Sequence, residues 1–267
     1  MHDKATKLDC ILQKRAPLLV AYSGGVDSAF LLAASQQALG SDRVLGVIAD
    51  SPSLPRQALA DALTLARDVI GASVEVVQTG EMEDPNYANN PINRCYFCKA
   101  ELFTRLDGLA QTRGFAAIAY GENADDMQQV RPGRQAAAEF AVLAPLRDAG
   151  LTKAEIRALS RELGLPTADA PAQPCLSSRI PHGTPVTREA LAMVEQGEAF
   201  VRSLGFRVFR VRHHQLEHAV APLALVQIAP TEMAAFEAGT HVELRRGLEA
   251  VGYAEVEIDP QGYRGVL

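Results

Sequence analysis

A glycine- and serine-rich turn near the N-terminus constrains the fold more than any other stretch of this sequence. Residues 17–21 form a short apolar run that suits a buried strand, and residues 29–39 have the composition of a helix that ends at Gly40. Between them, residues 23–28 read Ser-Gly-Gly-Val-Asp-Ser. The first N–H groups of a helix are unpaired, and glycine lets the backbone approach a ligand closely. This strand–turn–helix therefore predicts a binding site for a phosphate group.

The following segments repeat the alternation of strand and helix. We expect strands at residues 44–49, 73–77 and 116–120 and helices at residues 54–70 and 100–113. Such alternation predicts an α/β fold, in which a parallel sheet has helices on both faces. Ligands of these sheets bind beyond the carboxyl ends of the strands, where Ser23, Asp50 and Gly121 would lie together.

Polar residues at this edge are candidates for binding a nucleotide and its metal ion. The Gly-Lys-Ser/Thr ending of a Walker A motif is absent, so the loop is of another type. Asp27 and the acidic run at residues 122–126 can hold Mg²⁺ against phosphates, although Asp50 and this run can equally serve as helix caps. The predicted nucleotide-binding residues are Ser23, Gly24, Gly25, Asp27, Ser28, Asp50, Gly121 and Asp125.

The bulk properties limit the classes of function. The chain has 267 residues and a formal net charge of −6, which argues against a general coating of nucleic acid. We find no apolar run long enough to span a membrane and no signal peptide, so we expect a cytoplasmic protein. The 4 cysteines of such a chain favour metal binding or catalysis over disulfides.

A proline-rich stretch at residues 166–174 marks the expected boundary between two domains. We place the first domain at residues 1–168 and the second at residues 169–267. In the second domain, a helix should begin at Thr187, and strands are expected at residues 206–211, 223–228 and 253–258. This order predicts a small α+β domain.

Charged residues of the second domain are candidates for substrate binding. The guanidinium groups of Arg210 and Arg212 suit phosphates and carboxylates, because their donors are forked, but the pair can also be two surface arginines on alternate strand positions. Glu198 can contact the metal or the substrate, or it can be a solvated helix residue.

The cysteines allow more than one chemistry. Cys95 and Cys98 form a Cys-x-x-Cys pair, which can be a redox pair, half of a zinc site or a chance spacing. There is no second such pair, so one chain lacks a closed site of four cysteines. Together with Cys175, three thiolates can hold three irons of a [4Fe–4S] cluster and leave one iron open. Alternatively, Cys175 acts alone as a nucleophile beside Arg179. We expect Cys10 to be a buried small residue.

The turn at residues 23–28 resembles the pyrophosphate loop of the ATP pyrophosphatases, and nearly the whole chain is similar to the LarE family of that superfamily. The discriminating matches are residues 175–181 and the strand that carries Arg210 and Arg212. Further matches lie at residues 50–56, 93–96, 121–126, 131–133, 146–157, 171–172 and 262–264. The resemblance implies an adenine nucleotide alpha hydrolase-like domain, followed by a C-terminal domain for substrate binding and oligomerisation.

Members of the LarE family are sulfur transferases that help to make the nickel-pincer nucleotide cofactor of lactate racemase. The resemblance implies that ATP adenylates a carboxylate of a pyridinium-3,5-dicarboxylate mononucleotide, and that a sulfur nucleophile then displaces AMP to leave a thiocarboxylate. In some members the cysteine that matches Cys175 gives up its own sulfur, whereas others also carry the Cys-x-x-Cys pair and use a [4Fe–4S] cluster.

The residues of this chain favour the cluster version, because Cys95, Cys98 and Cys175 are all present. The expected cofactors are then ATP, Mg²⁺ and the cluster, and the expected ligand is a small pyridinium mononucleotide rather than a nucleic acid or a membrane. The resemblance further implies a homo-oligomer, in the family a hexamer. The expected substrate-binding residues are Arg179, Glu198, Arg210 and Arg212.

The chain departs from the family at Ala170, His182, Leu225 and Gln227, and at residues 127–130, where the family usually has an acidic-aromatic pair. These departures concern the choice of substrate more than activation by ATP. Rival interpretations are sacrificial transfer of the Cys175 sulfur, a related enzyme that thiolates tRNA, and a nucleotide-binding scaffold without catalysis. The acidic balance of the chain disfavours the tRNA enzyme.

Overall fold

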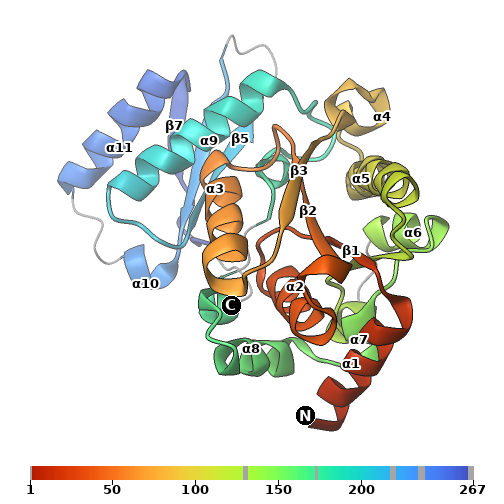
Figure 1. The fold of residues 1–267 in the computed structure, drawn as a ribbon. Coiled ribbons are helices and arrows are strands. Elements are labelled where there is room, and N and C mark those ends of the chain that lie inside the picture. Colours follow the sequence, from red (N-terminus) through yellow and green to blue (C-terminus); the bar gives the residue numbers. More distant parts are fainter. Residues whose placement is uncertain (1, 129–131, 172–173, 217–220, 234–237, 264–267) are drawn as a thin grey trace. The chain divides into compact units, whose positions relative to one another are not determined.

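The structure is a computed structural model that describes residues 2–128, 132–171, 174–216, 221–233 and 238–263 (Figure 1). Arg131, Ala172 and Arg264, which belong to the matched segments, lie outside the described residues. The chain forms two compact units. Unit 1 comprises Met1–Ser51, Arg56–Glu81 and Asn93–Pro171, and unit 2 comprises Pro52–Pro55, Met82–Ile92 and Ala172–Leu267. That a functional domain boundary lies at residue 168 stays a prediction.

The sheet of unit 1 has four parallel strands in the order β3-β2-β1-β4 (Figure 1). The strands are β1 Leu18–Ala21, β2 Val44–Asp50, β3 Val74–Gln78 and β4 Ala117–Tyr120. Leu18 pairs with both Val44 and Ala117, so β1 is an inner strand. All four of its residues are buried, as expected for a parallel strand covered on both faces.

Helices cover both faces of this sheet, which confirms the predicted α/β fold. The helical segments of unit 1 are α1 His2–Arg15, α2 Val26–Leu39, η1 Ser41–Arg43, α3 Arg56–Thr64, η2 Leu65–Ile70, α5 Arg94–Arg113, η4 Asp125–Gln128, α6 Pro132–Glu139, α7 Pro145–Ala149, α8 Lys153–Glu162 and η5 Pro166–Asp169. Helix α2 packs against β1, β2, α1 and α8. Helix α5 packs against β1, β4 and α6, where Phe103 and Leu106 share one core with Leu19 and Ala21.

Unit 2 contains a three-stranded sheet in the order β5-β6-β7, and this C-terminal sheet confirms the predicted α+β part. Its elements are α4 Pro85–Ala88, η6 Leu176–Arg179, α9 Arg188–Ser203, β5 Phe209–His214, β6 Leu223–Ile228, α10 Pro230–Met233, α11 Ala238–Val251 and β7 Glu255–Ile258, while η3 Glu81–Glu83 spans the two units. Phe209 and Val211 of β5 share a core with Leu244 of α11. Because side chains alternate along a strand, Arg210 and Arg212 lie on the opposite face of the sheet.

Three local predictions are wrong. The strand expected at residues 206–211 lies three residues later, as β5 at Phe209–His214. Helix α5 begins at Arg94 rather than at residue 100, so the Cys-x-x-Cys pair lies in its first turns. Cys10 is exposed rather than buried. The buried residues of α1 are Leu8 and Leu12, one turn apart, and Cys10 lies midway between them on another face of the helix.

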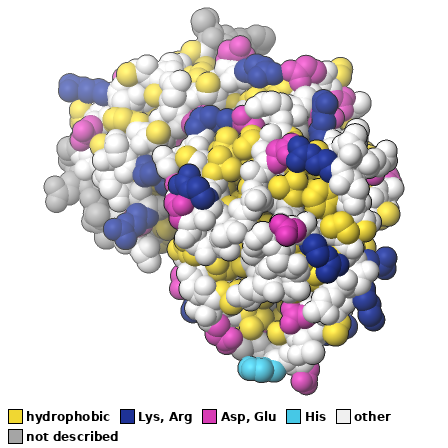
Figure 2. Space-filling view, in the orientation of Figure 1, with side chains coloured by type: hydrophobic (Ala, Val, Ile, Leu, Met, Phe, Trp, Pro, Cys, Tyr) yellow, Lys and Arg dark blue, Asp and Glu magenta, His cyan; other side chains and the backbone are white. Residues whose placement is uncertain are grey.

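The surface is of mixed charge. On the face shown in Figure 2, Lys and Arg side chains are interspersed with Asp and Glu side chains. Within the described parts of the chain, the helices are all too short or too polar to cross a membrane.

Candidate active site

The pyrophosphate loop joins β1 to α2 and is closed by its own serines. Ser28 Oγ accepts a hydrogen bond from the N–H of Ser23 at 3.1 Å, donates to the carbonyl of Gly25 at 3.1 Å, and lies 3.0 Å from Ser23 Oγ. Gly25 is the N-cap of α2 and offers no side chain to cap the helix. The first N–H groups of α2 are therefore left for a ligand, and the loop combines backbone and hydroxyl donors that suit an anion.

Two glycines allow the backbone to pack closely around this loop. Gly24 has a φ of +75°, and a Cβ there would lie 2.6 Å from the Cβ of Ala62. A Cβ on Gly121 would lie 2.8 Å from the backbone nitrogen of Ser28 and 2.9 Å from the carbonyl carbon of Asp27. The end of β4 thus touches the start of α2 directly, which places the loop after β4 next to the pyrophosphate loop.

Lys153 brings to this loop a positive charge that the sequence motif lacks. Its Nζ donates to Asp27 Oδ2 at 2.8 Å, and its backbone N–H donates to Asp125 Oδ2 at 2.8 Å. Asn123 Nδ2 donates to the same oxygen of Asp27 at 3.4 Å. The capping box of Thr152 fixes the first turn of α8 and so the position of Lys153.

The carboxylate oxygens of Asp27 and Asp125 suit a magnesium ion. Asp27 Oδ1 is buried and has no hydrogen-bond partner among the described residues, and Asp125 is exposed nearby. Carboxylate oxygens are the ligands that Mg²⁺ shares with nucleotide phosphates. In the described parts of the chain, no three His, Cys, Asp or Glu side chains converge on one point, so phosphates and water would complete the coordination.

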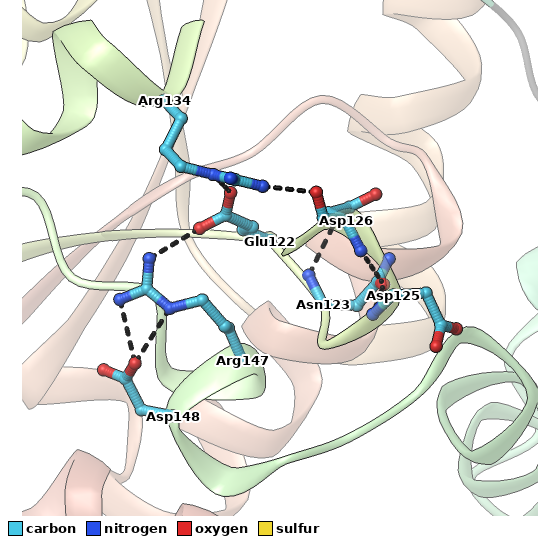
Figure 3. A network of polar contacts seen from close by, with 7 residues as sticks. All are labelled: Glu122, Asn123, Asp125, Asp126, Arg134, Arg147 and Asp148. Carbon is cyan, nitrogen blue, oxygen red and sulfur yellow. Dashed lines mark hydrogen bonds and ion pairs between the residues drawn. The ribbon is translucent and has the colours of Figure 1, made fainter. Parts of the chain in front are cut away.

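A buried carboxylate holds the loop that follows β4 (Figure 3). Glu122 is 4% exposed, and its two oxygens accept hydrogen bonds from Arg134 Nε at 2.7 Å and from Arg147 Nη1 at 2.8 Å. Burial alone would raise the pKa of Glu122, but the hydrogen bond from Arg134 and the charges of both arginines lower it below its usual value. Arg134 also donates to the carbonyl of Asp126. Glu122 therefore stays ionised and fixes the start and end of this loop.

The helix-cap interpretation fails for Asp50 but holds for the run at residues 122–126, where Asp125 Oδ2 accepts a hydrogen bond from the N–H of Lys153, the first residue of α8. Asp50 lies at the end of β2, as predicted, but accepts hydrogen bonds from Arg56 and from Gln78 Nε2, the latter at 2.6 Å. Burial raises the pKa of Asp50, and these two hydrogen bonds outweigh it, so its pKa lies below the usual value. In the loop after β4, Asn123 Oδ1 also acts as a cap and accepts from the N–H of Asp125 at 2.9 Å.

Cys95 and Cys98 lie in unit 1, one turn apart on α5, and Cys175 lies in unit 2. Residues three apart on a helix share a face. Cys95 is exposed and Cys98 is half-buried, and neither forms a disulfide. Each unit therefore holds part of the predicted ligand set, and a cluster on all three cysteines stays a prediction.

The backbone at Cys175 is held firmly while its thiol is exposed. Its carbonyl accepts hydrogen bonds from the N–H of Ser178 at 3.0 Å and from Arg179 Nη1 at 3.0 Å. The next N–H, that of Leu176, donates to the carbonyl of Ser53 at 2.8 Å. A fixed backbone with an accessible sulfur suits a nucleophile or a metal ligand.

Arg179 and Glu198 form a buried bidentate ion pair in unit 2. The Nε–Oε1 distance is 2.8 Å and the Nη2–Oε2 distance is 2.9 Å, with side chains 4% and 8% exposed. Glu198 is therefore not a solvated helix residue. Because Arg179 also binds the Cys175 carbonyl, the pair links α9 to residues 175–181, which we call the Cys175 loop. A role of the pair in substrate binding stays a prediction.

The two arginines of β5 lie beside the Cys175 loop. Arg212 Nε donates to Gln227 Oε1 at 2.6 Å, and Arg212 Nη1 donates to the carbonyl of Ser178 at 3.2 Å. Burial and the neighbouring charge of Arg179 lower the pKa of Arg210. The guanidinium groups of Arg179, Arg210 and Arg212 thus lie near one another, and the Arg179–Glu198 pair lies with them. An anionic ligand would offset their repulsion.

Comparisons with known proteins agree with this geometry. The family model described as NAD synthase matches residues 12–102, which include the pyrophosphate loop. An uncharacterized protein of Synechocystis sp. is 42% identical, over a region that covers 92% of this chain and 89% of the Synechocystis protein. The pyridinium-3,5-bisthiocarboxylic acid mononucleotide synthase of Lactiplantibacillus plantarum is 31% identical over 98% of this chain and 92% of its own.

A parallel sheet whose first strand leads through Ser-Gly-Gly-Val-Asp-Ser into a helix defines the PP-loop class of ATP-using, adenylating enzymes. Within that class, the similarity to the Lactiplantibacillus plantarum synthase extends over both units. The chain belongs to the LarE family of PP-loop enzymes.

Sequence reasoning did not single out Lys153 or Asn123, which contact Asp27. It included Glu122 among the acidic groups for Mg²⁺, whereas both Glu122 oxygens pair with Arg134 and Arg147. The capping box at residues 152–155 predicts the start of a helix, but the sequence does not show that this helix start lies next to the pyrophosphate loop.

Proposed function

We propose that this enzyme is an ATP-dependent sulfur transferase that converts a carboxylate of a pyridinium-3,5-dicarboxylate mononucleotide into a thiocarboxylate. The observation that supports it most is the exposed thiol of Cys175. The carbonyl of Cys175 accepts a hydrogen bond from Arg179, and Arg212 of β5 donates to the nearby carbonyl of Ser178. The printed name of the Lactiplantibacillus plantarum relative supplies the substrate class.

The first step activates the carboxylate, which is otherwise a poor electrophile. A carboxylate oxygen attacks the α-phosphorus of ATP, the bond from that phosphorus to the bridging oxygen breaks, and pyrophosphate leaves. The N–H groups of the pyrophosphate loop and the ammonium of Lys153 stabilise the charge on the pyrophosphate. Mg²⁺, held by Asp27 and Asp125, would supply further positive charge to the phosphates.

The second step transfers sulfur to the acyl adenylate. A sulfur nucleophile attacks the acyl carbon, and AMP leaves with the electron pair of the C–O bond, so the product retains sulfur. If Cys175 itself attacks, a thioester forms. Loss of the Cα proton and cleavage of the Cβ–S bond then release the thiocarboxylate and leave dehydroalanine at residue 175.

We favour a [4Fe–4S] cluster on Cys95, Cys98 and Cys175 as the sulfur carrier. The donor set fits by its chemistry, because all three side chains are thiols outside any disulfide and the first two share one face of α5. Such a cluster supplies an open iron that binds sulfide. The protein contributes the three thiolates and, through Arg179, a fixed backbone at Cys175.

Arg210 and Arg212 are the proposed contacts for the substrate phosphate or its second carboxylate. Guanidinium groups bind both anions through paired donors, and the crowding of cations beside Arg179 favours a ligand of several negative charges.

The test combines product analysis with intact mass. The anaerobically purified protein receives ATP, Mg²⁺, sulfide and the dicarboxylate mononucleotide. Pyrophosphate, thiocarboxylate and the protein mass are then measured. We expect several molecules of product per chain at an unchanged protein mass, and we expect Cys175→Ser to release pyrophosphate without forming thiocarboxylate.

One molecule of product per chain with loss of H₂S at Cys175 would establish the sacrificial version instead. Pyrophosphate release only with tRNA, or none at all, would overturn the proposal.

A further inference from the structure

Three hydroxyl groups from distant parts of the sequence meet in the interior of unit 2, directly behind the Cys175 loop. Ser53 Oγ lies 2.6 Å from the hydroxyl oxygen of Tyr87, which lies 2.7 Å from Ser177 Oγ. Ser177 Oγ and Ser53 Oγ are 3.0 Å apart. The three residues are 4%, 1% and 0% exposed. Each hydroxyl can donate one hydrogen bond and accept another, so the cluster satisfies itself away from water.

Further hydrogen bonds from the same two segments, 52–55 and 82–92, hold the Cys175 loop. The N–H of Leu176 donates to the carbonyl of Ser53 at 2.8 Å. The Nδ2 of Asn90, a residue that is 0% exposed, donates to the carbonyls of Pro181 and Thr184, each at 2.8 Å. Asn90 has a φ of 55°, a left-handed conformation that asparagine tolerates better than most residues. The segments 52–55 and 82–92 thus hold the chain on the C-terminal side of Cys175.

We infer that Ser53, Tyr87 and Ser177 are positioning residues that hold the Cys175 backbone for sulfur transfer. The inference rests on the proposed function, because it assigns these hydroxyls a purpose in that reaction. Arg179 fixes the carbonyl of Cys175, the carbonyl of Ser53 fixes the N–H of Leu176, and the hydroxyl cluster holds the side chain of Ser177. A sulfur placed by these contacts captures the acyl adenylate before water hydrolyses it.

The cluster belongs to unit 2, whereas the pyrophosphate loop belongs to unit 1. Loss of the cluster should therefore leave adenylation intact and slow only the capture of the adenylate. The diagnostic quantity is the ratio of pyrophosphate released to thiocarboxylate formed, which a general loss of stability would not raise.

The test is Tyr87→Phe, which keeps the ring and removes the hydroxyl that bonds Ser53 and Ser177. The matched control is Tyr253→Phe in the same unit, because the Tyr253 hydroxyl is buried and has no hydrogen-bond partner among the described residues. We expect Tyr87→Phe to form thiocarboxylate about 10-fold more slowly or worse, at an unchanged KM for ATP and unchanged iron content. The pyrophosphate-to-product ratio should rise by a similar factor, and Tyr253→Phe should match the unmodified protein.

Ser177→Ala provides a second reading if Tyr87→Phe does not fold, since it removes one hydroxyl and no ring. Equal ratios in Tyr87→Phe, Ser177→Ala and Tyr253→Phe would overturn the inference while leaving the proposed function in place. If the unmodified protein formed no thiocarboxylate from ATP, sulfide and the dicarboxylate mononucleotide, the proposed function itself would fail, so the two failures are distinguishable.

Discussion

Lys153 reaches the pyrophosphate loop from a position 126 residues further along the chain than Asp27. Its ammonium pairs with the Asp27 carboxylate, and the side chains of Lys153 and Asp27 are 39% and 18% exposed. A phosphate bound at the start of α2 would compete for the same ammonium. At the scale of single residues, the site is thus a set of charges held ready for an anion and a metal ion.

Replacement of Lys153 tests this arrangement. We expect Lys153→Met to raise the KM for ATP about 10- to 100-fold, because a hydrogen bond to a charged group contributes about 1.5–3 kcal/mol. Pyrophosphate release as a function of ATP concentration measures the effect. Lys7→Met, at an exposed position of α1, is the control and should not change the KM. A KM for Lys153→Met within about twofold of the control would refute the role.

The contact of β4 with α2 gives a second prediction. Gly121→Ala would drive a Cβ into backbone atoms of residues 27 and 28, so we expect lower stability and lost ATP binding. Gly108→Ala is the matched change, because Gly108 lies on the exposed side of α5 with open space around it. That variant should gain about 0.5–1 kcal/mol of stability. Thermal unfolding with and without ATP compares them, and equal behaviour would contradict the close contact.

At the scale of elements, buried and surface charges fix where helices begin and where loops end. The start of α8 is set by its capping box, and Glu155 of that box also pairs with Lys4 of α1 at 2.7 Å. Hydrogen bonds from Lys4 and from the N–H of Thr152 lower the pKa of Glu155 to about 2. These contacts tie the helix that carries Lys153 to the N-terminal helix.

The pH dependence of stability follows from this shift. The folded pKa lies below the unfolded value near 4.5, so the ionised Glu155 stabilises the protein above about pH 4.5, and that contribution is lost as the pH falls toward 2. Glu155→Gln should therefore melt below the unmodified protein at neutral pH, and the gap should close on acidification. Melting temperatures between pH 7 and pH 3 test this, and a constant gap would count against it.

The buried ion pairs of Glu122 with Arg134 and Arg147 predict a larger loss of stability than the loss of the Glu155–Lys4 pair. Glu122→Gln leaves Arg134 and Arg147 beside a neutral group, and breaking a buried ion pair costs about 3–5 kcal/mol. Asp169→Asn is the control, since its pair with Arg161 is exposed and should cost less than about 1 kcal/mol. Urea unfolding gives both values. Similar small losses in the two variants would show that the network is not a structural anchor.

At the scale of the whole molecule, the chain passes between the units repeatedly, because the segments 52–55 and 82–92 belong to unit 2 although they are flanked by unit 1. Each of the predicted cluster ligands follows such a passage closely. Cys95 lies three residues after Ile92, and Cys175 lies three residues after Ala172. The proposed cluster therefore depends on both units together.

Single cysteine variants test this dependence. We expect Cys95→Ser, Cys98→Ser and Cys175→Ser each to lower the iron and sulfide content after anaerobic reconstitution, because three thiolates hold the cluster. Cys10→Ser, at an exposed position of α1, should retain the content of the unmodified protein. An iron-free unmodified protein, or equal iron in all four variants, would refute the cluster.

The sequence by itself determined the α/β class, the positions of the strands and the pyrophosphate loop, since these depend on local apolar patterns and on glycines at a single turn. It also pointed to Arg210 and Arg212 through strand alternation, which places them on one face. Only the tertiary structure decided that Lys153 meets Asp27, that Glu122 joins two arginines, and that Tyr87 lies behind Cys175. These contacts join residues far apart in the chain, and no local periodicity encodes which distant side chains the packing of helices and strands will bring together.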